Sequence, residues 1–217
     1  MSDRYRYSGG EERIQRVGSG HSTQVLILEP LFEEKNRTRR LIAQIMQLLD
    51  NRGIGTALPD LPGTGESFVN SDTLKFSDWL LSAQAATQSL RPTAIISFRA
   101  GSLLDGVISA APRWRFAPET GARAVRDLER MRLTAVNDPN LYGGHRLRPE
   151  FVEQLRAATL SSGFLCRTVR LETDAMKADH KVIGTPLWRR AEPGEDAALA
   201  QALTNDLEHW IRTCAAF

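Results

Sequence analysis

The chain has 217 residues, and its 28 lysines and arginines nearly balance its 26 aspartates and glutamates, leaving a net charge of +2. This balance excludes a bulk polyanion binder, so we expect no nucleic-acid partner. No apolar run approaches the ~18 residues that a membrane span requires, and the N-terminus lacks an apolar signal region. The two cysteines of the chain cannot form a disulfide framework. We therefore expect a cytoplasmic protein with an N-terminal arm or edge strand over residues 1–20 and a single domain over residues 21–217.

The first half of the sequence predicts strands that alternate with helices. Residues 24–28 (QVLIL) form an apolar run typical of a strand covered on both faces. The next helix has Asn36 as its expected N-cap and Gly53 as its C-terminal glycine. The remaining elements of this half are strands 55–58 and 94–98, helix 75–90, and a helix that resumes after residue 101 and runs through residue 108. This alternation indicates an α/β fold with a mainly parallel sheet and helices on both faces.

The second half is less regular in its apolar pattern. Its expected elements are strands 113–118, 163–172 and 181–183, helices 119–134, 149–161 and 195–213, and a long loop over residues 137–148.

Three of the expected strands end in recognisable motifs. PLFEEKNRTRR follows the first, DLPGTGES the second, and SFRAG the third. Together they resemble the oxyanion loop, the Asp-x-x-Gly-x-Gly-x-Ser turn and the nucleophile elbow of the α/β-hydrolase superfamily. The resemblance implies an α/β-hydrolase-like fold with a minimal or shortened cap.

Further segments indicate a resemblance to a more specific family within this superfamily. With GGHRLRPEF and IGTPLWRRAEPGED, the chain resembles the exosortase A system-associated hydrolases of the second type over most of residues 24–210. Those bacterial proteins belong to loci for exopolysaccharide production and surface-protein sorting. This chain is shortened relative to them between about residues 163 and 185.

The elbow lacks its nucleophile. An active elbow reads Gly-x-Ser-x-Gly, whereas this chain has Ser97-Phe98-Arg99-Ala100-Gly101. Arg99 stands in the nucleophile position, where it stays protonated and cannot attack a carbonyl. The resemblance places Arg at this position in the exosortase-associated type as well.

The fold's histidine is also missing from the loop before the last helix, residues 184–190. The four histidines of the chain are His21, His145, His180 and His209, and none fits that place. Asp174 follows a late strand and is the candidate for the acid of the triad. We favour the interpretation that Asp174 is an exposed carboxylate of a loop.

Two serines near the elbow are alternative nucleophiles. Ser97 lies two positions before Arg99 and is expected on the same face, while Ser102 lies in the first turn of the following helix. A structural role is favoured for both. Cys166 lies in an apolar strand, where a small core residue is the more common use of cysteine.

Arg99 therefore suggests charge recognition in place of catalysis. At a helix N-terminus, a guanidinium adds to the attraction for carboxylate or phosphate. Two alternatives stay open: Arg99 pairs with Glu29, Glu33 or Glu34, or it binds an anion. The backbone N–H groups of Ala100 and Phe32 are expected to point the same way. The predicted ligand-binding residues are Leu31, Phe32, Glu33, Glu34, Arg99, Ala100 and Trp188.

The leading hypothesis is a degraded, non-catalytic hydrolase that binds a small anionic or acyl-type ligand, or a protein partner or second copy. The alternative is an ester or thioester hydrolase with a non-standard nucleophile. A third is a structural subunit of an exopolysaccharide assembly. The sequence contains no Walker phosphate loop and no cluster of histidines and aspartates at the spacing of metal ligands. We therefore expect neither a cofactor nor a metal.

Overall fold

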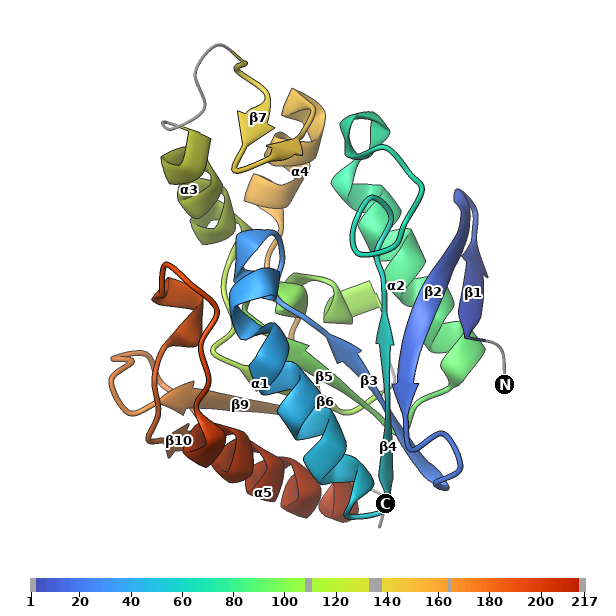
Figure 1. Cartoon of the computed structure of the whole chain (residues 1–217), viewed down its shortest axis with the longest axis vertical. Coiled ribbons are helices and arrows are strands. Elements are labelled where there is room, and N and C mark those ends of the chain that lie inside the picture. Colours follow the sequence, from blue (N-terminus) through green and yellow to red (C-terminus); the bar gives the residue numbers. More distant parts are fainter. Residues whose placement is uncertain (1–2, 108–110, 133–137, 164, 215–217) are drawn as a thin grey trace.

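An eight-stranded sheet runs through the centre of the molecule in the order β1-β2-β4-β3-β5-β6-β9-β10 (Figure 1). The computed structural model describes residues 3–107, 111–132, 138–163 and 165–214. The strands are β1 (Arg4–Tyr7), β2 (Gly10–Val17), β3 (Thr23–Leu28), β4 (Ile54–Pro59), β5 (Ala94–Phe98), β6 (Arg113–Phe116), β9 (Cys166–Leu171) and β10 (His180–Val182).

Six neighbouring strands, from β4 to β10, run parallel, whereas β2 pairs antiparallel with both of its neighbours, β1 and β4. The mainly parallel sheet predicted from the sequence is thus confirmed. The hairpin places the first residues of the chain at the sheet edge, where β2 pairs with β4. Three of the central strands, β3, β5 and β6, end side by side.

The helices are α1 (Glu33–Asp50), α2 (Phe76–Leu90), α3 (Gly121–Arg132), α4 (Pro149–Ala157) and α5 (Ala197–Cys214). Short 3-10 turns are η1 (Ser71–Thr73), η2 (Arg99–Leu103), η3 (Asp105–Val107) and η4 (Leu187–Arg189), and a small hairpin is made by β7 (Leu141–Tyr142) and β8 (His145–Arg146). Among the helices of the described ranges, none is long and apolar enough to cross a bilayer.

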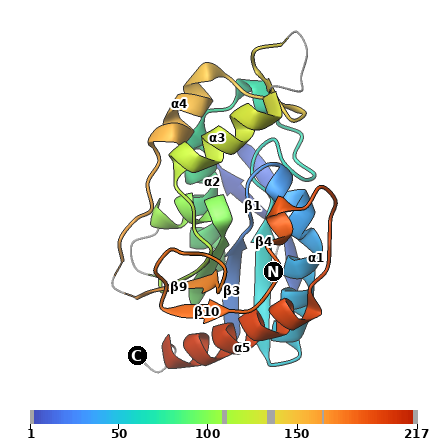
Figure 2. The same cartoon turned by 90° about the vertical axis from the view of Figure 1, so that its left-hand side faces the viewer.

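The sheet separates two apolar cores because side chains alternate along each strand. In β3, Val25 and Ile27 pack with α1 and α5 on one face, whereas Leu26 and Leu28 pack with α2 on the other. Figures 1 and 2 show α1 and α5 together on one side of the sheet and α2 on the opposite side. Helices therefore cover both faces, as the sequence predicts.

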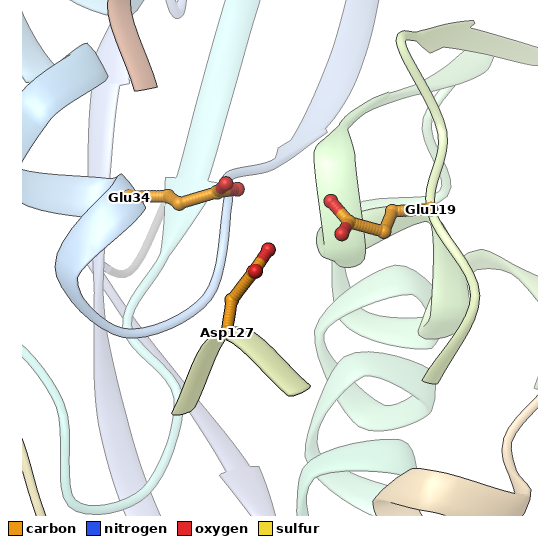
Figure 3. A group of neighbouring side chains, drawn as sticks. All are labelled: Glu34, Glu119 and Asp127. Carbon is orange, nitrogen blue, oxygen red and sulfur yellow. The ribbon is translucent and has the colours of Figure 1, made fainter. Parts of the chain in front are cut away.

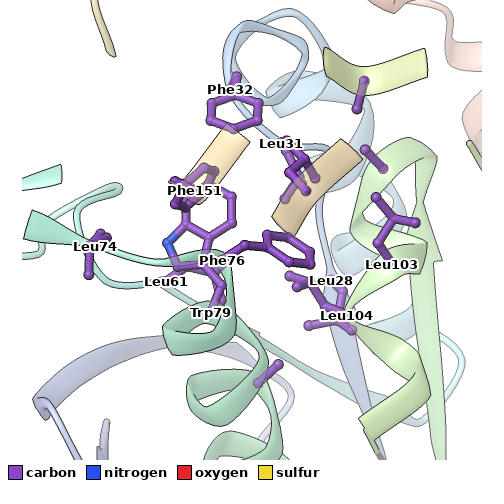
Figure 4. Packing of buried hydrophobic residues seen from close by; sticks show 14 of the residues in the cluster. Leu28, Leu31, Phe32, Leu61, Leu74, Phe76, Trp79, Leu103, Leu104 and Phe151 are labelled. Atoms are coloured by element: carbon purple, nitrogen blue, oxygen red, sulfur yellow. The ribbon is translucent and has the colours of Figure 1, made fainter. Parts of the chain in front are cut away.

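The chain between β6 and β9 forms a small insertion from α3, the β7–β8 hairpin and α4, which lies beyond the carboxyl ends of the strands (Figure 1). Aromatic packing anchors it to α2. The centroid of the Phe151 ring lies 5.0 Å from that of the Trp79 ring and 5.9 Å from that of the Phe76 ring, and both contacts are edge-on (Figure 4). This insertion is the short cap that the resemblance implies.

Two local expectations are wrong. The helix α1 begins at Glu33, three residues before the expected cap Asn36, because the chain turns sharply at Phe32 (φ 56°). After β5 the chain forms the 3-10 turns η2 and η3 in place of an α-helix. Gly101 and Gly106 both fall in this stretch, and each glycine disfavours a helix by about 1 kcal/mol.

Other boundaries shift by smaller amounts. Gly53 has the expected positive φ of 76° but lies three residues after the last residue of α1. The predicted loop over 137–148 contains the β7–β8 hairpin. The ends of the helices expected through residue 108 and residue 134 lie outside the described residues.

Tyr5 fixes the N-terminal hairpin to α2, and its removal provides a test of that junction. The hydroxyl of buried Tyr5 donates to the carbonyl oxygen of Asp60 at 2.6 Å and shares a hydrogen bond with Ser82 of α2. Tyr5→Phe should lower the free energy of unfolding by about 1–2 kcal/mol, because it leaves two buried polar groups short of a partner. Urea unfolding measures this. Tyr7→Phe is the matched control and should change little.

Candidate functional site

The elbow predicted at Arg99 forms a sharp turn directly after β5. Arg99 has φ 52°, a left-handed conformation that few non-glycine residues adopt. Gly101 lies against the end of β3, where an added Cβ would stand 2.3 Å from the carbonyl oxygen of Glu29. The last residue of the motif must therefore be glycine, and the turn presents the side chain of Arg99 beyond the strand.

Arg99 is 6% exposed and is surrounded by partners. Its Nε and Nη2 donate to the two carboxylate oxygens of Glu34, both at 3.1 Å. Nη1 donates to the carbonyl oxygen of Ala117 at 3.1 Å, Nη2 also contacts Glu119, and the guanidinium carbon lies 4.6 Å from the ring centroid of Trp188. A bidentate ion pair and a cation–π contact thus hold the guanidinium.

Of the three candidate glutamates, the structure selects Glu34. Glu29 instead pairs with Lys35 at 2.6 Å, and Glu33 lies 3.7 Å from Nε2 of His145. Glu34 lies in the first turn of α1, so the early start of this helix determines which carboxylate meets Arg99.

Two further acids join this ion pair from the segment after β6. Glu119 and Asp127 point toward Glu34, and carboxylate oxygens of all three lie within 4.8 Å of one another (Figure 3). Glu119 follows β6 by three residues, at the same sheet edge as Arg99, and this shared edge is the signal that could have predicted it. Asp127 lies in α3, and no motif marks it.

The carboxylates outnumber the cation that they surround. Burial raises the pKa of Glu119 to about 7, although Arg99 acts in the opposite direction. Burial also raises the pKa of Glu34, again against the effect of Arg99. With one guanidinium between two acids, Glu119, the more buried of them, is about half protonated near pH 7.

A cavity of about 500 Å³ opens beside Arg99. All the predicted ligand-binding residues line it, although whether they bind a ligand stays a prediction. Its charged lining residues are Glu33, Glu34, Arg37, Arg99, Glu119, Arg123, Arg126, Asp127, Arg130 and Arg189; its apolar ones are Leu31, Phe32, Ala100, Ala124, Leu128, Met131 and Trp188. Six arginines thus face four acids, and the lining carries a positive surplus.

Backbone strain is concentrated around this cavity. Phe32, Arg99 and Ala117 have φ values of 56°, 52° and 46°, and they follow β3, β5 and β6 respectively. Positive φ at non-glycine residues costs roughly 1–3 kcal/mol each and clusters at functional sites. Three such residues at adjacent strand ends support a ligand site at this edge of the sheet.

The serines lie in a different environment. Ser97 donates to the carboxylate of Asp105 at 2.9 Å, and its hydroxyl lies 3.0 Å from that of Ser102. Asp105 in turn forms a bidentate pair with Arg115, at 2.8 and 2.6 Å. All four residues are buried. The expectation that Ser97 shares the face of Arg99 is wrong, since its neighbours are those of the α2 side of the sheet.

Asp174 and the histidines are likewise engaged elsewhere. Asp174 follows β9, pairs with Arg170 at 2.6 Å, and has a lowered pKa because the N–H of Met176 and Arg170 bond to its carboxylate. His145 comes from the insertion and packs edge-on against the ring of Phe32. Asp174 is thus half of a partly buried ion pair, and its expected role as an exposed loop carboxylate stays a prediction.

Comparison with known proteins supports the architecture. The sequence matches no protein-family model and none of the curated proteins compared with it. Among solved structures, the chain is similar to Est1E from Butyrivibrio proteoclasticus with bound ferulic acid (TM-score 0.63, 13% identity, 100% of both chains). It is also similar to a malate-bound thermophilic esterase from Thermogutta terrifontis (0.58, 14%, 97% of this chain and 98% of that chain).

The chain has an α/β-hydrolase-like fold. The bottromycin epimerase BotH, in complex with bottromycin A2, is similar as well (TM-score 0.52, 12% identity, 98% of both chains). Esterases and an epimerase therefore share this architecture, and at these identities the likeness establishes the fold alone.

Glu119 provides a test of the electrostatics at this site. Its raised pKa means that the unfolded chain releases a proton above about pH 4.5 whereas the folded chain keeps it until about pH 7. The free energy of unfolding of the wild type therefore falls as the pH rises through this window. Glu119→Gln should not show this fall, so its free energy of unfolding relative to the wild type should increase by about 1–3 kcal/mol between pH 5 and pH 8. Urea unfolding at both pH values measures it, with the exposed Glu153→Gln as control.

Proposed function

We propose that this protein is a non-catalytic member of the α/β-hydrolase-like fold whose pocket binds a small anionic ligand with an acyl-type apolar body. The observation that carries the proposal is Arg99 itself. A guanidinium occupies the position from which the elbow would present a nucleophile, and it is fully engaged by Glu34, Glu119 and the carbonyl oxygen of Ala117.

The pocket chemistry supports an anion. Six of its lining residues are arginines, and the guanidinium groups of two of these, Arg126 and Arg189, make no hydrogen bond or ion pair with any residue that the structure describes. They come from α3 and η4 and are exposed. Unpaired guanidinium groups at a partly apolar cavity are well suited to a carboxylate or phosphate, which they bind through paired N–H donors.

The apolar lining supports an acyl-type body. Ala124, Leu128 and Met131 recur at helical spacing on α3, and Leu31 and Phe32 come from the segment that joins β3 to α1. A charged stripe, Arg123, Asp127 and Arg130, runs beside the apolar one. A ligand with one charged end and one apolar end matches both.

The wider biological setting follows from the sequence resemblance. The proposal includes a link to exosortase and exopolysaccharide systems, on the motifs DLPGTGES, SFRAG and IGTPLWRRAEPGED. The binding of a protein partner or of a second copy is compatible with the same pocket.

Ligand binding can be tested with octanoate, which carries one carboxylate and an apolar chain. Octanoate at saturating concentration should raise the melting temperature by several degrees, since a domain of this size gains about 2–4 °C per kcal/mol of linked stabilisation. Octanol, which lacks the charge, should not. Arg126→Ala and Arg189→Ala should each weaken binding about tenfold (about 1.4 kcal/mol), whereas Arg6→Ala on β1, whose side chain is 87% exposed, should have no effect.

Catalysis is tested separately with p-nitrophenyl acetate and butyrate. Without a nucleophile at the elbow, we expect hydrolysis at the rate of buffer alone. Robust turnover that is lost in Ser97→Ala, Ser102→Ala or Asp174→Ala would instead establish the alternative, an ester hydrolase with a non-standard nucleophile.

A further inference from the structure

Two carboxylates share the one guanidinium of Arg99. Glu34 and Glu119 both pair with it, and Asp127, which itself pairs with Arg130 at 3.0 Å, adds a third carboxylate within 4.8 Å. Of these acids, Glu119 is the most enclosed, with 1% of its side chain exposed against 20% for Glu34. Glu34 makes two well-aligned hydrogen bonds to Arg99, whereas the contact of Glu119 is an ion pair to a single nitrogen.

The groups that face Glu119 come from several elements. Helix α1 contributes Glu34, and α3 contributes Asp127 and Arg123, whose Nε lies 3.5 Å from Glu119. The turn η2 contributes Arg99. Around the same cavity stand four more arginines: Arg37, Arg126, Arg130 and Arg189.

We propose that the pocket takes up its carboxylate ligand together with one proton from solvent, and that Glu119 carries this proton. The inference rests on the proposed function and adds its regulation. No covalent bond other than the O–H bond on Glu119 is formed, and the ligand remains a carboxylate throughout.

The reason is electrostatic. A carboxylate that enters the cavity approaches Glu34, Glu119 and Asp127, and its repulsion by the charge of buried Glu119 is only weakly screened. Protonation of Glu119 removes one of these charges and leaves Arg99 paired with Glu34 alone. The pKa of about 7 for Glu119 places this change near neutral pH. If only the protonated form binds, the apparent affinity follows its population, which falls about tenfold between pH 6 and pH 8.

His145 is another titratable group near the pocket. It lies 3.7 Å from Glu33, and burial lowers its pKa below the ordinary value. A positive charge on His145 at low pH would also favour an anion, so the experiment must separate the two residues.

Calorimetric titration of the full chain with octanoate tests the inference. The wild type should bind about tenfold more weakly at pH 8 than at pH 6. Measurements in two buffers of different ionisation enthalpy should give an uptake of nearly one proton per octanoate at pH 8 and nearly none at pH 6. Glu119→Gln, which mimics the protonated acid, should bind at both pH values as the wild type does at pH 6, without proton uptake.

Two variants serve as matched controls. Asp127→Asn removes a charge from the same cluster but keeps Glu119, so binding should strengthen while a pH dependence remains. His145→Asn should keep the wild-type dependence. Equal wild-type affinity at pH 6 and pH 8, or a dependence that survives in Glu119→Gln and disappears in His145→Asn, overturns the inference alone. An absence of octanoate binding to the wild type at both pH values overturns the proposed function with it. Circular dichroism verifies that each variant is folded.

Discussion

A single buried guanidinium ties together the parts of the chain that make the pocket. Arg99 connects the end of β5 to α1 through Glu34, to the segment after β6 through Ala117 and Glu119, and to η4 through Trp188. A buried charge must be compensated, and removing one partner of such a group typically costs about 3–5 kcal/mol. The relative positions of these four segments therefore depend on one side chain, and the shape of the cavity depends on them.

Backbone geometry and this charge network support each other. The positive φ at Arg99 directs the guanidinium beyond the strand, and Ala117, whose φ is also positive, turns its carbonyl oxygen toward Nη1. Phe32, the third strained residue, brings the first turn of α1 to the same edge, which places Glu34 opposite Arg99. Strain of this kind persists where surrounding contacts over-determine it. The ion pairs and the aromatic packing around Phe32 supply such contacts.

Much of the fold was predictable from the sequence, because apolar runs and turn motifs are local signals. Strands 24–28, 55–58 and 94–98 lie in one parallel sheet, and an arginine at the elbow required an acidic partner. The choice of Glu34 was not predictable: adjacent helical residues point in different directions, and the strained turn at Phe32 that sets the start of the helix has no sequence signature. Asp127 was missed because only the path of the insertion brings α3 over the elbow.

The close approach of Gly101 to Glu29 has a consequence for how such a site can change. Contact between backbones holds Gly101 against the end of β3, whichever side chain stands at position 99. Arg99→Ser would place a hydroxyl on a ready-made elbow, yet it would also leave Glu34 and Glu119 facing each other without their shared cation. A serine at this position would therefore require the acids to change as well. Arg99, Glu34 and Glu119 form a set whose members constrain one another's replacement, so we expect substitutions at these three positions to occur together.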